Sequence, residues 1–140
     1  MSEQSIRGSV EYLNPEKMHR NPAFTQVVVA TNPAKTIYVG MQNAVSAQGE
    51  IVGKGDLAAQ TEQVMKNIET CLQAAGAAAE HIVIWTIYVQ HGQPIFPAIE
   101  VGMRWWGNRP NPPANNVIFV PAFSPPDFLI GIEAVAVVPL

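Results

Sequence analysis

The sequence predicts a layered α+β fold, with two helices on one face of a mixed sheet of about six strands. Runs of β-branched and other apolar residues, bounded by Gly, Pro, Asn and Asp, predict the strands. Two segments with apolar residues at helical spacing predict the helices. The order of strands, helix, strand, helix and strands is typical of an α+β unit. The 140 residues, 48% of them hydrophobic, suit a single domain over 1–140.

The N-terminal part of the chain predicts three strands. The segment 10–13 predicts a short first strand that ends at the Asn-Pro pair following it. The segments 24–30 and 36–42 also have the composition of strands. Between them, residues 32–35 read Asn-Pro-Ala-Lys, which is typical of a turn. We therefore expect 24–30 and 36–42 to form a hairpin.

The clearest element is a helix over 57–75. Its apolar residues recur at i, i+4, i+7, i+8 and i+11, which is the period of one helix face. Asp56 is placed to cap the first turn, and Gly76 can end the helix in the left-handed conformation. Cys71 lies on the predicted apolar face, which indicates a small buried residue.

A strand and a second helix follow. The almost continuous apolar run at 82–89 predicts a strand covered on both faces. The next helix is weaker in pattern; a Gln-Pro pair opens it at position 93 and a glycine ends it at 107. It contains Trp105 and Trp106, which lie about 100° apart around the helix, so only one can face the core. The other supplies packing at the helix edge or an aromatic wall for a ligand, and Trp105 is the candidate for that wall.

The segment 112–138 contains two more apolar runs separated by the turn 124–127, which predicts two strands. Polar residues interrupt both runs. Asn115 and Asn116 follow a proline-rich entry, and Glu133 stands in an otherwise apolar strand. A carboxylate at such a position either faces solvent or is held in a cleft with a partner.

Charge and composition argue against several classes of protein. The net charge is −3 and no cluster of Lys or Arg occurs, so a nucleic-acid groove has no electrostatic footprint. No apolar run is long enough to span a bilayer, and the N-terminus has no signal-peptide core. The single cysteine excludes an internal disulfide and fits a reducing compartment. We therefore expect a cytoplasmic protein that contacts neither nucleic acid nor membrane.

Metal and cofactor motifs are missing from the sequence. His19, His81 and His91 lie in different segments without ligand spacing, and no Cys pair accompanies them. The stretch 53–56, Gly-Lys-Gly-Asp, has neither the Walker spacing nor the dinucleotide fingerprint. We expect no metal and no cofactor. With both helices on one face, the other face of the sheet is left apolar, and self-association is the simplest way to cover it.

An ordered set of segments resembles the RidA/YjgF family over nearly the whole chain. These segments are Asn21-Pro22-Ala23-Phe24-Thr25-Gln26, Ile37 to Gln42, Gly49-Glu50-Ile51-Val52, Gly55-Asp56, Gln60-Thr61-x-Gln63-Val64-x-x-Asn67, Ala74-Ala75-Gly76, 82–89, Pro113-Ala114 and Ile132 to Ala136. The resemblance implies a chorismate-mutase-like fold and a homotrimer with a small-molecule cleft at each subunit interface. We expect the cleft residues to be Phe24, Met41, Gln42, Asn115, Asn116, Gly131 and Glu133, with Trp105 as the candidate aromatic wall. Glu133 is the candidate catalytic residue, or else a structural ion-pair or hydrogen-bond partner within the trimer.

The chain departs from the family's active deaminases at three positions. Asn115 stands where those enzymes have an arginine that clamps the substrate carboxylate. A neutral amide offers a carboxylate much less than a bidentate guanidinium does. Gly131 replaces a glutamate that positions the hydrolytic water, and Phe24 replaces a tyrosine. The chain is therefore not expected to be a standard 2-imino acid deaminase.

Three functions remain open. The first is hydrolysis of an imine or enamine metabolite, with Glu133 as acid and base and with Asn115 and Asn116 orienting the substrate. The second is a binding protein that holds a small metabolite without turnover. The third, action on RNA as for some relatives, is opposed by the acidic net charge. The lining of the cleft discriminates between them, because a polar cleft at Glu133 favours hydrolysis, a dry aromatic one favours binding and a basic rim favours RNA.

Overall fold

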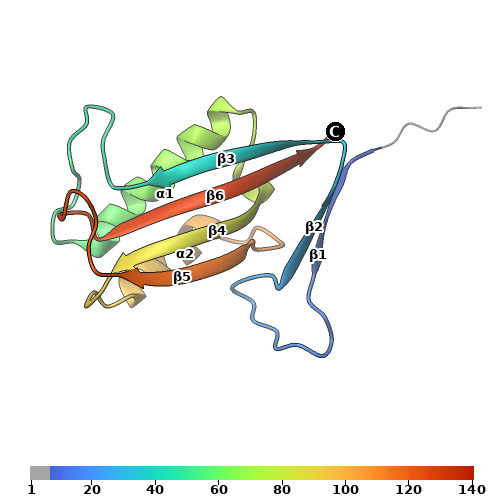
Figure 1. Cartoon of the computed structure of the whole chain (residues 1–140), viewed down its shortest axis with the longest axis horizontal. Helices are drawn as coiled ribbons and strands as arrows, with labels where there is room; N and C mark the ends of the chain where they lie inside the picture. The colour runs from blue at the N-terminus through green and yellow to red at the C-terminus, as the bar shows by residue number, and fades with distance from the viewer. Residues whose placement is uncertain (1–6) are drawn as a thin grey trace, which may run out of the picture.

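The computed structural model describes residues 7–140 (Figure 1). Along the chain its elements are β1 (Ser9–Leu13), β2 (Val27–Thr31), β3 (Ala34–Gln42), α1 (Leu57–Ala74), the short 3₁₀ helix η1 (Ala79–His81), β4 (Ile82–Gln90), α2 (Phe96–Trp106), β5 (Ala114–Val120) and β6 (Ile130–Pro139). This order of strands and helices is the predicted one. Both helices lie on the same face of the main sheet, as Figure 1 shows, so the predicted α+β fold class is confirmed.

The main sheet has four strands in the order β3-β6-β4-β5. β4 and β5 run parallel, while β6 is antiparallel to both β3 and β4. The two strands of the C-terminal segment are therefore not neighbours, because β4 lies between them. In the ladder Trp85 pairs with Asn115 and Thr86 pairs with Glu133, which places the polar residues of β5 and β6 on either side of β4.

The predicted hairpin between the second and third strands is wrong. β2 pairs with β1 in a separate two-stranded ribbon, which projects from one end of the main sheet in Figure 1. β3 pairs instead with β6, from Ala34 opposite Pro139 onward. The six expected strands therefore form two sheets. The physical reason is a match of length: β3 has nine residues and β6 ten, whereas β1 and β2 have five each. Long strands that share a buried face bury more surface by pairing together.

The core lies between the main sheet and the helices. The buried face of α1 includes Val64, Ile68 and Leu72, and the facing residues of the sheet include Ile130 and Ile132. Asp56 caps α1 as predicted, its Oδ1 accepting from the backbone N–H of Ala59 at 3.1 Å. Cys71 is half-buried and packs against this core.

The second helix begins later than its sequence pattern indicates. It starts at Phe96, not at the Gln-Pro pair, and Pro97 occupies the first turn, where its missing N–H costs no hydrogen bond. It ends at Gly107, which adopts a φ of 64° and donates its N–H to the carbonyl of Met103. Within residues 7–140, neither helix is long and apolar enough to cross a membrane.

Candidate functional site

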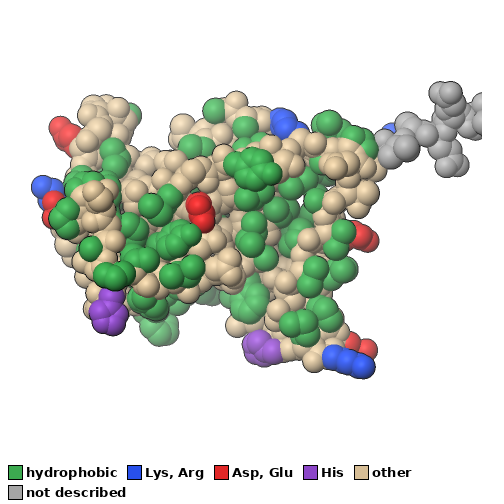
Figure 2. All heavy atoms as spheres, in the orientation of Figure 1, with side chains coloured by type: hydrophobic (Ala, Val, Ile, Leu, Met, Phe, Trp, Pro, Cys, Tyr) green, Lys and Arg blue, Asp and Glu red, His purple; other side chains and the backbone are tan. Residues whose placement is uncertain are grey.

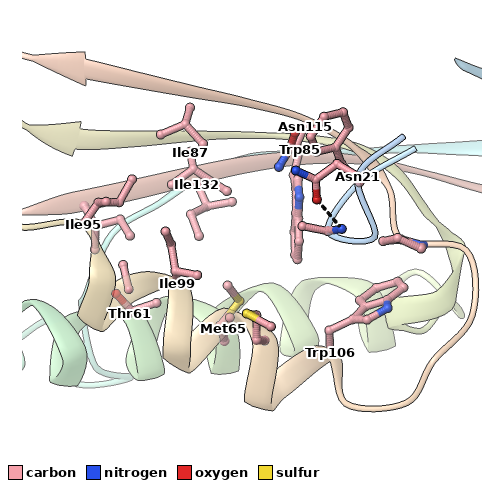
Figure 3. Close-up of a pocket in the computed structure, with 18 of the residues that line it drawn as sticks. Asn21, Thr61, Met65, Trp85, Ile87, Ile95, Ile99, Trp106, Asn115 and Ile132 are labelled. Atoms are coloured by element: carbon pink, nitrogen blue, oxygen red, sulfur yellow. Dashed lines mark hydrogen bonds between the residues drawn. The ribbon is translucent and has the colours of Figure 1, made fainter. Parts of the chain in front are cut away.

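A cavity of about 410 Å³ lies between α2 and the helix-covered face of the main sheet (Figure 3). Its walls come from α2, from β4, β5 and β6, from two side chains of α1, and from the loop 21–24. We call this cavity the α2 pocket. The helix α2 contributes Ile99 and Gly102, and β4 contributes Trp85 and Ile87. Its size lies within the range of small-molecule sites in proteins.

The loop that closes one end of the α2 pocket is tied to the start of β5. The hydroxyl of Thr25 donates to the carbonyl of Pro112, and the N–H of Thr25 donates to the carbonyl of Pro113 at 3.3 Å. Thr25 is buried, so these bonds are shielded from water. They bring Asn21 and Phe24, which are far from Asn115 in sequence, into the lining of the same pocket.

The pocket is polar at this end through two amides. Asn21 Oδ1 accepts from the N–H of Ala23 at 2.8 Å, the bond dashed in Figure 3, so its Nδ2 is the group left for a ligand. Asn115 is half-buried, and among residues 7–140 its side chain makes no hydrogen bond. Of the residues that the structure describes, none that lines the pocket carries an ionisable side chain.

Three tryptophans pack beside the pocket. The rings of Trp85 and Trp106 line it, with their centroids 6.1 Å apart. The indole N–H of Trp106 donates to the carbonyl of Arg109 at 2.9 Å. Trp105 lies 6.1 Å from Trp85 but does not line the pocket. The guanidinium of Arg109 lies over Trp105 and Trp106, at 5.4 and 5.9 Å from their centroids. These contacts hold Trp106 against Trp85 and Arg109.

The other face of the main sheet, which we call the open face, carries no helix in the described part of the chain. Figure 2 shows apolar side chains spread over it with one acidic group among them. Glu133 lies on this face, and its Oε1 accepts from the hydroxyl of Tyr88 at 2.8 Å. This hydrogen bond, with burial and the nearby negative charge as lesser causes, raises the pKa of the Tyr88 phenol above its ordinary value. A shallow hollow beside Glu133 is lined also by Tyr38 and Thr86.

Gly131 also faces this side of the sheet, and Met41 covers it. A Cβ placed on Gly131 would lie 2.7 Å from Met41 Sδ and 2.9 Å from Asn43 Nδ2. Asn43 Nδ2 donates to the carbonyl of Ile130 at 3.0 Å, so it has little freedom to move. A side chain at this position therefore requires Met41 or Asn43 to shift. Gln42, the neighbour of Met41, donates from Nε2 to the carbonyl of Gly40 at 3.2 Å.

The structure thus divides the residues predicted for one site. Phe24 and Asn115 lie together in the α2 pocket. Met41, Gly131 and Glu133 lie on the open face, and so does Asn116, whose Nδ2 donates to Thr86 Oγ1 at 3.3 Å. Gln42 pairs with Ile132 of β6, and Trp105 lines neither the α2 pocket nor the hollow at Glu133. The sequence interpretation missed Asn21, Trp85, Trp106 and Tyr88. The alternation of strands could have shown that Asn115 and Asn116 face opposite ways.

Two polar side chains of α1, Gln60 and Asn67, have a structural role. Gln60 is fully buried and makes three hydrogen bonds: Nε2 donates to the carbonyls of Gly53 and Asp127, and Oε1 accepts from the N–H of Leu129. Asn67 Nδ2 donates to the carbonyls of Asn43 and Val45, each at 3.0 Å. These amides hold loops to the helix, which satisfies backbone groups that have no strand partner. In the part of the chain that the structure describes, no cluster of His, Cys, Asp or Glu could hold a metal ion.

Comparison with known proteins agrees with this fold. RutC family protein PH0854 of Pyrococcus horikoshii is 38% identical over 88 residues, which are 63% of this chain and 67% of that protein. A crystal structure of YyfB from Yersinia pestis, a Rid-family protein of unknown function, has a TM-score of 0.80 at 34% identity and covers 92% of this chain and 98% of that one. Escherichia coli TdcF with bound serine shares the fold, at a TM-score of 0.66 and 24% identity over 74% of this chain and 80% of that one. The family model described as endoribonuclease L-PSP matches residues 17–138, and the chain therefore belongs to this family, the RidA/YjgF family.

Proposed function

We propose that this chain binds a small, uncharged and largely apolar molecule in the α2 pocket and does not turn it over there. The RidA/YjgF family is linked to imine deamination and to small-molecule binding. The observation that carries the choice is the lining of the pocket, which is mostly aromatic and aliphatic, is polar only through Asn21, Asn115 and Thr61, and has no ionisable group among residues 7–140. Proton transfer to or from a substrate needs a positioned acid or base, and the lining offers none. Burial of apolar surface supplies the affinity instead.

The test uses isobutylbenzene as an apolar probe. Its binding should change the fluorescence of the protein, because Trp85 and Trp106 line the pocket. Gly102→Leu should abolish this change: a Cβ at Gly102 meets only Met65 Cε, at 3.9 Å, so the side chain has room to grow into the pocket. Glu100→Leu is the matched control, since Glu100 is an exposed residue of the same helix. Equal binding by wild type and Gly102→Leu would contradict the proposal.

A second candidate function is hydrolysis of an imine or enamine by addition of water, with Glu133 as acid and base. The bond from Tyr88 is the specific observation in its favour, because it orients the carboxylate and leaves Oε2 for a water molecule. Loss of a fresh imine, made in situ from an amino acid by an oxidase, measures this activity. Acceleration that disappears in Glu133→Gln would support hydrolysis; equal rates with and without protein would eliminate it.

A homotrimer is also part of the proposed function. Members of this family are typically homotrimers. On the open face Tyr38 is 79% exposed and Ile118 is 43% exposed, so we propose that three copies cover this face and that the hollow at Glu133 becomes a cleft between subunits. Light scattering measures the mass, and a monomer would contradict this assembly.

Action on RNA is the function that these sites support least. Among residues 7–140, neither the α2 pocket nor the hollow at Glu133 is lined by Lys or Arg, whereas RNA is bound through its phosphates.

A further inference from the structure

We propose that the ligand of the α2 pocket is a neutral carboxamide with a branched aliphatic tail, bound with its amide against Asn21 and Asn115. This inference rests on the proposed binding function and names the chemical class of the ligand. Three features of the pocket lead to it. The first is that the lining is polar at one end and aliphatic at the other. The second is that its two amides have hydrogen-bonding groups without a partner among residues 7–140. The third is that none of the described residues in the lining is charged.

The pocket is amphipathic along its length. In Figure 3 Asn21 and Asn115 lie together at one end, next to Trp85. The other end is aliphatic, with Ile87, Ile132, Ile95 and Ile99 converging from two strands and from the start of α2. A ligand that fills this space has a polar head beside the amides and an apolar tail among the isoleucines. Branched aliphatic groups match such a wall better than a flat ring, because the isoleucines present methyl groups from several directions.

A head that both accepts and donates a hydrogen bond uses both asparagines. Asn21 Oδ1 is already occupied by the N–H of Ala23, which leaves Asn21 Nδ2 as a donor to a ligand carbonyl. Asn115 has no hydrogen bond from its side chain to any of residues 7–140, so its Oδ1 can accept from a ligand N–H. A carboxamide has one carbonyl and one NH₂ group on the same carbon, which satisfies both asparagines at once.

Charged heads fit this end poorly. A carboxylate would leave water for a site without a cation, and two neutral donors replace little of its hydration. An alkylammonium would find the faces of Trp85 and Trp106, but no carboxylate lines the pocket to neutralise it. Asn115 offers a neutral amide, which suits a neutral head better than an anionic one.

The test compares three compounds that differ only in the head: isocaproamide, isocaproate and isohexylamine. Isothermal titration at neutral pH should show that the amide binds at least about tenfold more tightly than either ion. Asn115→Leu should remove this preference while isobutylbenzene still binds, and Asn115→Arg should reverse it in favour of isocaproate. Gln73→Leu removes an exposed amide from α1 and is the matched control; it should leave all affinities unchanged.

The outcomes separate this inference from the proposed function. If isobutylbenzene binds the wild type and not Gly102→Leu, but the amide binds no better than the acid, the pocket is a binding site and the carboxamide class is wrong. If isobutylbenzene itself does not bind, the binding function fails, and this inference fails with it. A preference for the amide that survives in Asn115→Leu would also overturn the assignment of the head group, provided that circular dichroism shows the variant to be folded.

Discussion

The two faces of the main sheet differ in enclosure, charge and exposure to solvent, although the same strands form both. The helix-covered face encloses an apolar pocket with two amides and no charge in its lining. The open face carries the carboxylate Glu133 with its phenol partner Tyr88, among side chains that are exposed in a single chain. Consecutive residues are divided between the faces, because side chains alternate along a strand. Within one chain, Asn115 and Glu133 therefore cannot act on the same small molecule.

This difference separates two positions that the resemblance to the family's active deaminases assigns to one site. By that resemblance Asn115 stands at the position of an arginine, and it lines the α2 pocket. Gly131 stands at the position of a glutamate, and Met41 covers it on the open face. The remaining carboxylate is Glu133, and it lies on the face away from the pocket.

The largest expected effect comes from two adjacent substitutions on opposite faces. Ile132 is fully buried beside the pocket, so Ile132→Ala should lower the free energy of unfolding by about 2–5 kcal/mol. Glu133 is only half-buried and has one neutral partner, so Glu133→Ala should cost about 1 kcal/mol or less. Urea unfolding followed by circular dichroism measures both. Similar losses for the two variants would contradict the assignment of these residues to different faces.

Introducing a glutamate at position 131 is expected to have the next largest effect on stability. Gly131→Glu should destabilise the fold by about 1–3 kcal/mol, because Met41 Sδ would lie 2.7 Å from the new Cβ. Met41→Ala in the same chain should recover part of this loss, which thermal denaturation of the single and double variants can show. If the single variant is as stable as the wild type, Met41 is free to move and the packing role of Gly131 is wrong.

Replacing Gly102 by alanine is expected to change the stability less, and to increase it. It lies inside α2, where Ala is favoured over Gly by about 1 kcal/mol, and its Cβ would contact only Met65 Cε. Gly102→Ala should therefore raise the melting temperature while it narrows the pocket and weakens binding of isobutylbenzene. Differential scanning calorimetry and fluorescence titration measure the two effects. A variant that is destabilised would mean that the helix needs glycine there for packing.

The smallest effect is the titration of Tyr88 on the open face. Its raised pKa means that the folded protein holds the phenol proton more tightly than the unfolded chain does. The stability from this group is therefore complete below the ordinary tyrosine pKa of about 10, and is lost as the pH rises through the raised value. Glu133→Gln should make Tyr88 ionise at lower pH, as followed by phenolate absorbance with Tyr88→Phe to assign the signal. An unchanged titration curve would show that Glu133 does not contact the phenol in solution.

The sequence by itself determined the elements of this protein. Local periodicity predicts α1, because one helix turn brings its apolar residues to one face, and Asp56 and Gly76 mark its ends. The apolar run of β4 and the interrupted runs of β5 and β6 predict strands for the same reason. The family also follows from short ordered segments. All of these signals depend on neighbours in the chain.

Only the tertiary structure decided what meets across the chain. It pairs β3 with β6 and β2 with β1, and it inserts β4 between the last two strands. Alternation along β5 separates Asn115 from Asn116, but the packing of α2 decides which of them faces a pocket. The hydrogen bonds of Thr25 bring the loop at Asn21 to the same place. These pairings and contacts depend on the surface area that segments distant in sequence bury together. A local sequence pattern contains no information on that area.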